Sequence, residues 1–229
     1  MKLLSNGNTN AKTIKNELET YIMYLAPANT IGTANLCPFA SEGCKKVCLY
    51  TAGMGVFTNV QEARIKKTRF WAEDRLGFYI QLNSELLDIQ RKAMKQGKTI
   101  AVRLNGTSDV DHLDMLKRYA GCDWLQSEHV IFYDYTKNPN IIRKYAGTNY
   151  KLTFSRSECN DAQAMEVLNS GGNVAVVFSD YVPKEYNGYK VINGDESDLR
   201  YYDPYNVVVG LKAKGKAKKD TSGFVIASY

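Results

Sequence analysis

TIAVRLNG (residues 99–106) is a short apolar, partly β-branched run, and SDVDHLDMLKRYAG (residues 108–121) follows it with apolar residues at helical spacing. This pair predicts a buried strand, a polar turn and then a helix that starts after Ser108 and ends at Gly121. The pattern of strand then helix is repeated at 129–147 and 150–171. In the repeat at 150–171, Asn160, with Gln163 three residues later, predicts the start of the helix.

Further strands are predicted at 173–181, 189–194, 206–212 and 224–229. Apolar strands that alternate with helices indicate an α/β fold with a mostly parallel sheet. Crossovers of one hand either wind such a sheet in two directions or curl it into a partial or complete barrel, and we expect barrel-like βα repeats over 98–229.

The N-terminal segment, residues 1–97, differs from these repeats. Apolar residues recur at helical spacing from Phe57 to Gly97. Asp74 and Gly77 predict a break into two helices, with Asp74 capping the second, and Gly97 predicts its end. The apolar positions that show this helical spacing are Val60, Ala63, Ile65, Phe70, Phe78, Leu82, Leu86, Ile89 and Ala93.

Length and composition favour a single domain over residues 1–229, because 44% of the 229 residues are hydrophobic. The first residues turn polar after four positions, unlike a secretory signal, and no run approaches the roughly 20 apolar residues of a membrane span. The sequence therefore predicts a cytoplasmic protein that does not bind membranes.

Polar residues gather where the predicted strands end. The carboxyl ends of parallel strands meet at one edge of a sheet, which is where α/β proteins place their sites. The catalytic candidates are cations that would place an anionic substrate and carboxylates that would accept protons: Arg103, Asp109, Lys137, Arg156 and Glu158. The cofactor-binding candidates are Asn105, Tyr135 and Asp180.

The stretch NLCPFASEGCKKVCLY (residues 35–50) contains Cys37, Cys44 and Cys48, three of the five cysteines of the chain. In a reducing compartment, clustered thiols are more often metal ligands or catalytic groups than disulfides. The spacing CxxxxxxCxxxC matches neither the paired CxxC of structural zinc sites nor the CxxCxxC run of ferredoxins. Metal binding is therefore predicted, and the spacing leaves the metal open between an iron–sulfur cluster and zinc.

A fourth ligand, if the chain supplies one, is expected to be Cys159, which follows a strand and so lies on the same side as the polar turns. Cys122 and His129 flank a turn at the opposite end, and Cys122 is expected to pack as a small hydrophobic residue. His112 lies in the first turn after a strand and is a further candidate. An open fourth position is the alternative.

Three stretches, LCPFASEGCKKVCLYTAG, VRLNGTSDV and FYDYTKN, resemble the motifs of a phage-encoded family, the gene product eighty-eight-like proteins. The resemblance extends from about Asn35 to Asp180. It implies a viral protein that acts in the host cytoplasm and carries an iron–sulfur cluster, expected to be 4Fe–4S. Radical S-adenosylmethionine enzymes are similar in outline only, because their CxxxCxxC pattern is absent, and the sequence does not support S-adenosylmethionine binding.

Two functions from different classes have support in the sequence, and a third, a non-catalytic inhibitor of a host protein, has no sequence feature that would test it. The first is an iron–sulfur oxidoreductase or radical-type enzyme that acts on a small molecule or exchanges electrons with a redox partner. The second is a zinc-stabilised protein that binds nucleic acid through the lysine run at 212–219 and through some of its 16 tyrosines. The interpretation of that lysine run as a solvated connection between two strands competes with the second function.

Overall fold

The computed structural model describes residues 1–7 and 18–228. In these residues ten strands join into one sheet: β1 (Leu4–Asn6), β2 (Thr20–Met23), β3 (Ile100–Arg103), β4 (Val130–Thr136), β5 (Tyr150–Ser155), β6 (Asn173–Phe178), β7 (Glu185–Tyr186), β8 (Tyr189–Asn193), β9 (Val208–Lys212) and β10 (Val225–Ile226).

The α-helices of the described residues are α1 (Glu42–Lys46), α2 (Thr58–Glu73), α3 (Arg75–Gln96), α4 (His112–Ala120), α5 (Pro139–Lys144) and α6 (Asp161–Asn169). The described residues also form short 3-10 helices: η3 (Leu49–Thr51), η4 (Gly53–Val56), η5 (Trp124–Gln126), η6 (Arg200–Tyr202) and η7 (Gly215–Lys219). The break between α2 and α3 is as predicted, since Asp74 Oδ1 accepts a hydrogen bond from the Gly77 N–H at 2.8 Å.

The sheet has the order β1-β2-β3-β4-β5-β6-β9-β8-β7, and β10 pairs with β6. Strands β2 to β6 are parallel and follow one another across the sheet in chain order. The prediction of an α/β fold with a mostly parallel sheet is therefore confirmed. The path is open, with the antiparallel strands β1 and β7 at its ends, so closure into a barrel is not confirmed.

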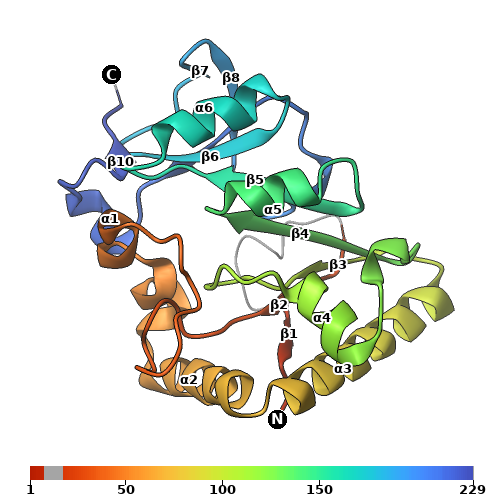
Figure 1. Cartoon of the computed structure of the whole chain (residues 1–229). Helices are drawn as coiled ribbons and strands as arrows, with labels where there is room; N and C mark the ends of the chain where they lie inside the picture. Colours follow the sequence, from red (N-terminus) through yellow and green to blue (C-terminus); the bar gives the residue numbers. More distant parts are fainter. Residues whose placement is uncertain (8–17, 229) are drawn as a thin grey trace.

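One face of the sheet is covered by α3 to α6 (Figure 1). Alternate strand residues such as Val102 and Phe132 pack with α3 and α4, while Val174 and Val176 pack with α6. The intervening residues point to the other face, where Ala101, Ile131 and Tyr133 pack with Leu199. Because successive side chains of a strand point to opposite faces, the helices on one face cover only every second side chain of each strand.

One detail of the predicted helices is wrong. The N-cap of α4 is Asp111, whose side chain accepts from the Asp114 N–H at 3.2 Å. Ser108 instead donates to Asn105 Oδ1 within the turn before the helix. Asn160 is the N-cap residue of α6, as predicted, although its side-chain oxygen accepts from the Ser157 N–H rather than from an N–H of the helix.

The apolar positions with helical spacing are buried in α3 but not in α2. All five of these positions in α3 are buried. On α2 the buried residues are Arg64, Thr68 and Trp71, whereas Ala63 is exposed and the other apolar positions of this spacing are only partly buried. The buried face of α2 is polar because it packs against the cysteine segment and Tyr24 rather than against the sheet alone.

Candidate functional site

The three clustered cysteines lie in a segment that turns back before α2. Asn35 Oδ1 accepts a hydrogen bond from the Cys37 N–H at 2.9 Å, and Ser41 Oγ accepts one from the Cys44 N–H at 3.1 Å. Ser41 therefore caps α1. Cys37 precedes α1, Cys44 lies within it and Cys48 precedes η3, so the three thiols come from before, within and after one short helix.

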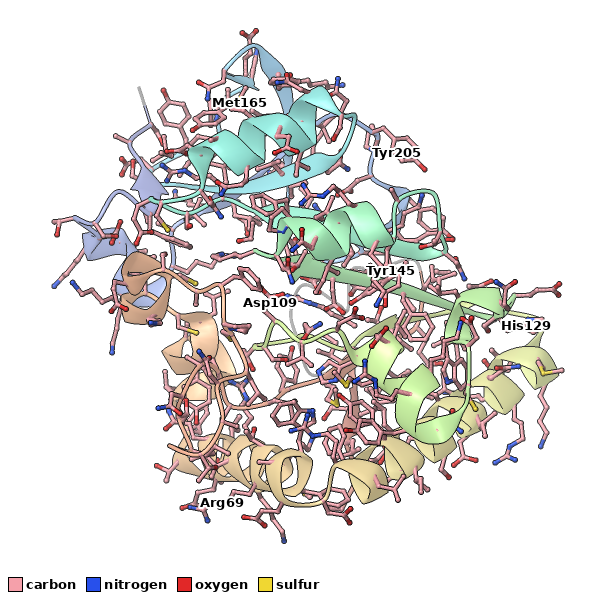
Figure 2. The ribbon with its side chains drawn as sticks, viewed as in Figure 1. Arg69, Asp109, His129, Tyr145, Met165 and Tyr205 are labelled. Carbon is pink, nitrogen blue, oxygen red and sulfur yellow. The ribbon has the colours of Figure 1, made fainter. Side chains whose placement is uncertain are left out.

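The turn after β3 contacts the start of this segment. The Asp109 N–H donates to the Leu36 carbonyl at 2.8 Å, and Cys37 Sγ lies 3.8 Å from the Thr107 carbonyl oxygen. Figure 2 shows Asp109 on the side of the molecule where the cysteine segment lies. The segment is thus seated at the carboxyl end of β3, the edge at which parallel topology was expected to gather the site.

Glu158, which follows β5, holds the beginning of α1. Its two carboxylate oxygens accept hydrogen bonds from Ser41 Oγ and from the Gly43 N–H, each at 2.7 Å. Burial alone would raise the pKa of Glu158, but these hydrogen bonds bring that pKa below its ordinary value. A Cβ at Gly43 would lie 2.7 Å from Glu158 Oε2, so glycine permits this close approach.

Cys37 is partly buried among groups that disfavour its thiolate. Burial, together with negative charge on Asp109, Cys48 or Cys44, raises the pKa of Cys37 to about 12. The Ala28 N–H acts in the opposite direction, because it donates a hydrogen bond to the sulfur. Cys37 therefore keeps its proton at neutral pH unless a cation binds it.

Cys48 differs because cations lie near it. Burial raises the pKa of Cys48, as does the neighbouring Cys44, while the Tyr50 N–H, Lys137 and Arg64 lower it. The three thiols influence one another and therefore share one small region. Two of them also receive a backbone N–H group.

The thiols do not form a closed metal site as placed. Within residues 1–7 and 18–228, no three Cys, His, Asp or Glu side chains lie close enough together to hold a metal ion. The donor set nevertheless suits a thiophilic metal, since three sulfurs come from one segment and N–H hydrogen bonds to sulfur are a feature of iron–sulfur sites. The residues fit such a group in chemistry, and their sulfurs would have to approach one another to share it.

Cys159 lies in the same turn as Glu158, after β5, and is exposed. Its sulfur lies 3.7 Å from Ser157 Oγ. Because Glu158 contacts the beginning of α1, Cys159 is on the cysteine side of the sheet, as expected from the sequence. Ligation by Cys159 stays a prediction.

The other candidate ligands lie elsewhere. Cys122 packs against the large core and its sulfur donates to the Ala120 carbonyl at 3.3 Å, in agreement with the predicted packing role. His112 is fully buried, with Nδ1 3.0 Å from Tyr79 Oη, and burial lowers its pKa to about 3. His129 lies on the opposite side of the molecule from Asp109 (Figure 2).

Asp109 and Lys137 are brought together by neighbouring turns. Asp109 accepts hydrogen bonds from Thr136 Oγ1 at 2.6 Å and from the Lys137 N–H at 2.9 Å. Burial raises the pKa of Asp109, and these hydrogen bonds offset only part of that rise. Lys137 Nζ donates to Ser155 Oγ at 2.6 Å, so the turns after β3 and β4 and the end of β5 are linked beside Cys48.

The two predicted arginines are balanced by carboxylates of the chain. Arg103 Nη1 lies 3.1 Å from Asp198 Oδ2, and its Nε lies 3.7 Å from Asp134 Oδ1. Arg156 Nε lies 2.6 Å from Asp161 Oδ1. Sequence alone does not reveal these partners, and a role of either arginine with an anionic substrate stays a prediction.

The three predicted cofactor-binding residues have separate contacts. Asn105 is buried and closes the turn after β3, since its Oδ1 accepts from Ser108 Oγ at 2.9 Å. The Tyr135 ring faces the Arg103 guanidinium at 4.9 Å. Asp180 is exposed, and its carboxylate accepts from Ser179 Oγ.

Two residues near Cys48, the buried Arg64 and the partly buried Tyr50, were not identified from the sequence. Arg64 is only 8% exposed and lies 4.8 Å from the Tyr24 ring and 5.4 Å from the Tyr50 ring. Its neighbour Tyr50 belongs to η3, directly after Cys48. The signal was present, because Arg64 lies four and seven residues before the buried Thr68 and Trp71 on one face of α2.

The lysine-rich connection lies between β9 and β10 and beside α1, as the adjacent orange and blue segments of Figure 1 show. Ala213 and Ala217 are buried with Val47. The five lysines from 212 to 219 are exposed in a segment that joins β9 to β10, which agrees with a connection between strands, while nucleic-acid binding through them stays a prediction. Lys214 pairs with Asp195 at 2.7 Å.

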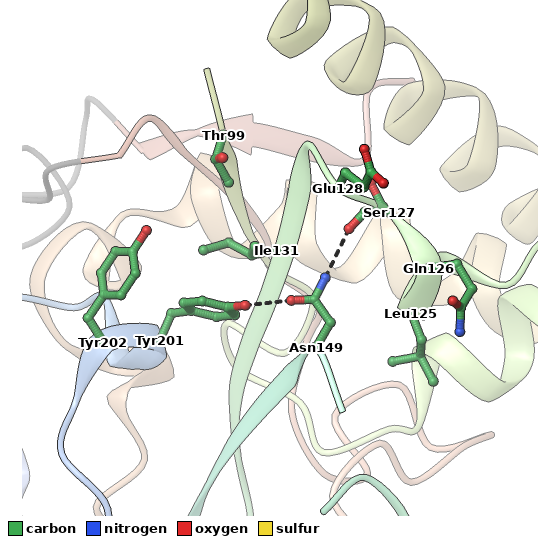
Figure 3. A pocket seen from close by; sticks show the side chains of 9 residues that line it. All are labelled: Thr99, Leu125, Gln126, Ser127, Glu128, Ile131, Asn149, Tyr201 and Tyr202. Carbon is green, nitrogen blue, oxygen red and sulfur yellow. Dashed lines mark hydrogen bonds between the residues drawn. The ribbon is translucent and has the colours of Figure 1, made fainter. Parts of the chain in front are cut away.

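A cavity of about 610 Å³ lies at the other end of the sheet, before β3, β4 and β5 (Figure 3). Tyr201 Oη donates to Asn149 Oδ1 at 2.6 Å, and Asn149 Nδ2 donates to the Ser127 carbonyl at 3.1 Å. Its polar groups bond to one another, and Glu128 is the carboxylate in its lining. We assign the candidate site to the cysteine segment rather than to this cavity.

No helix of the described part of the chain is both long enough and apolar enough to cross a lipid bilayer. Neither a curated protein nor a solved structure matches the chain. A family model does match, over residues 2–228, almost the whole sequence. By that match, which agrees with the resemblance of its three motifs, the chain belongs to the Gene product 88 family.

Proposed function

We propose that this protein is an iron–sulfur protein, with a 4Fe–4S cluster held by Cys37, Cys44 and Cys48, and that it acts as an oxidoreductase or radical-type enzyme on a small molecule. The observation that carries the proposal is the seating of a three-thiol segment on the turns after β3 and β5. Parallel α/β proteins place their chemistry at this edge.

The surroundings of the thiols support this assignment. Cys37 and Cys48 are partly buried, and each receives a backbone N–H group. Burial and hydrogen bonds to sulfur are the means by which proteins adjust the reduction potential of such clusters. A bound cluster would supply one-electron transfer at this edge of the sheet.

The residues around the segment would prepare the site for a substrate. Lys137 brings a positive charge to Cys48, and Asp109 is a partly buried carboxylate that could hold or accept a proton. Glu158 serves the segment first as an anchor of α1. The phage origin of the family agrees with a protein that works in the host cytoplasm, which we include in the proposal.

Purification without oxygen tests the proposal. The protein should be brown, with broad visible absorbance, and should contain iron and sulfide in a fixed ratio to protein. Serine substitution of Cys37, Cys44 or Cys48 should remove the metal, whereas Cys122→Ser, the matched control at the far end of the sheet, should retain it. A colourless, folded protein that contains zinc alone would refute the cluster.

A second candidate is a zinc-stabilised protein that binds nucleic acid. One observation favours it: the exposed Lys45 and Lys46 of α1 lie next to the lysine-rich connection, because Val47 packs with Ala213 and Ala217. Replacing Lys212, Lys214, Lys216, Lys218 and Lys219 by Gln separates the two functions. Loss of a salt-dependent affinity for DNA or RNA would favour this candidate, and unchanged metal content with no such affinity would favour the first.

A further inference from the structure

Arg64 is a buried cation that lacks a carboxylate partner in the part of the chain that the structure describes. Its Nε has no hydrogen-bond partner there, and its Nη1 lies at a long 3.5 Å from the Tyr50 carbonyl. A buried charge without a partner is costly, and most buried arginines are paired. Arg156 and Arg200, the other buried arginines in the described part of the chain, each have a carboxylate within 4 Å, which makes Arg64 the exception among them.

The aromatic rings beside Arg64 compensate for only part of this cost. The guanidinium lies 4.8 Å from the Tyr24 ring and 5.4 Å from the Tyr50 ring, distances at which cation–π attraction contributes about 0.5–2 kcal/mol. The Tyr50 hydroxyl is itself buried without a hydrogen-bond partner. Arg64 Nε and the Tyr50 hydroxyl are therefore two neighbouring hydrogen-bond donors that each need an acceptor.

The backbone around Arg64 is shaped to approach it closely. A Cβ at Gly55 would lie 3.2 Å from Arg64 Nη1 and would collide with the Tyr50 carbonyl. Gln61 of α2 fixes this turn, since its Nε2 donates to the Gly55 carbonyl at 2.7 Å. A glycine and a side-chain clamp thus keep η4 against the guanidinium.

We propose that Arg64 and the Tyr50 hydroxyl form a subsite beside Cys48 that binds the oxyanion of a small ligand, either a carboxylate or a phosphate group. A guanidinium presents a planar fork of N–H donors that matches both oxyanions. Arg64 acts electrostatically on Cys48, and so does Lys137 from the turn after β4, so the bound group would lie at the cysteine segment.

The subsite deepens the proposed function, because it names the chemical class of the substrate, yet it needs no metal. It stands on Arg64 and Tyr50, neither of which is a proposed ligand. Anion binding and metal content can therefore succeed or fail separately, and each is measured on the same protein.

Calorimetric titration and thermal unfolding of the full chain, with inorganic phosphate in one arm and malonate in the other, test the subsite. We expect millimolar amounts of one probe to raise the unfolding temperature, and the better probe identifies the group. Arg64→Gln should weaken binding at least about tenfold, and Tyr50→Phe should weaken it by a smaller factor. The exposed Arg69 of the same helix, labelled in Figure 2, provides the matched control Arg69→Gln, which should bind as the wild type does.

Arg64→Lys keeps the charge but loses the fork, so it tests the subsite even if Arg64→Gln does not fold, and it should bind more weakly than the wild type. Without either probe, Arg64→Gln should be at least as stable as the wild type, because it removes an unpartnered buried charge. The proposal is overturned if neither probe affects the wild type, or if Arg64→Lys and the wild type respond equally. It is also overturned if the Arg64 variants bind both probes as the wild type does and differ only in how the alkylation rate of Cys48 depends on pH. Arg64 would then stabilise the Cys48 thiolate rather than bind an anion.

Discussion

Replacing Glu158 by Ala is expected to loosen the cysteine segment while leaving the sheet intact. Glu158 bridges two parts of the chain that are 115 residues apart, since it follows β5 and accepts from the Gly43 N–H. Ser41 Oγ already accepts the Cys44 N–H, so Glu158 and Ser41 together satisfy two of the N–H groups at the beginning of α1. The substitution leaves the buried Gly43 N–H without its acceptor.

The size of the effect follows from these contacts. A hydrogen bond to a charged group contributes about 1.5–3 kcal/mol, and a buried donor left without an acceptor costs about 1–3 kcal/mol. Glu158 is only half-buried, so solvent screens its charge, and we expect a local loss of about 1–2 kcal/mol. Each 1.4 kcal/mol corresponds to about a tenfold change in an equilibrium, so the segment should open roughly tenfold more often.

Alkylation of Cys44 and Cys48 by iodoacetamide, located by mass spectrometry of peptides, measures this opening. The rate should rise roughly tenfold in Glu158→Ala, while Cys122, at the far end of the sheet, should react as before. The control Glu42→Ala, which removes an exposed glutamate of α1, should leave all alkylation rates unchanged. Equal alkylation rates in Glu158→Ala and the wild type would refute the anchoring argument.

Three further outcomes are expected. Gly43→Ala should also speed alkylation of Cys44, because the added Cβ would lie 2.7 Å from Glu158 Oε2 and displace it; an unchanged rate would contradict the close approach. Leu82→Ala, which empties a fully buried position of α3, should lower the free energy of unfolding by about 2–5 kcal/mol in urea titrations, whereas Ile80→Ala, at a 53% exposed position two residues earlier in the same helix, should change it by about 0.5 kcal/mol or less. Burial lowers the pKa of His112 from 6.5 to about 3, so the unfolded chain takes up a proton between these values while the folded chain does not, and stability should fall as the pH drops through this window. His112→Asn should lose less stability between pH 7 and pH 4 than the wild type, and equal losses would show that His112 does not govern the decline.

The parallel part of the fold could be predicted because each of its strands has its own local pattern. The predictions for β3 to β6, β8, β9 and β10 agree with the structure, as do the ends of α3 at Asp74 and Gly97. Strands β1, β2 and β7 were missed. They have two to four residues each, and, unlike the equally short β3, none of them leads closely into a helix that would mark where the strand ends.

The side of the sheet on which the site lies could also be predicted, because topology alone places the turns after parallel strands at one edge. Thr107, Asp109 and Glu158 do contact the cysteine segment there. Individual roles could not be predicted, because they depend on partners that are distant in sequence. Arg103 reads as an available cation until Asp198, 95 residues later, is found against it.

Arg64 was overlooked for a different reason. The helical period of α2 was judged by its apolar residues, yet the side that is buried carries Arg64 and Thr68. A polar residue on a buried helix face contradicts local amphipathic patterning, and such contradictions concentrate at functional sites because function tolerates their cost. The same logic separates Arg64 from Arg103 and Arg156: carboxylates of the chain compensate those two charges, whereas the charge of Arg64 still requires an anion beside Cys48. For this chain, the buried cation that does not fit the helix pattern is therefore a better guide to the substrate than the arginines that the strand pattern selected.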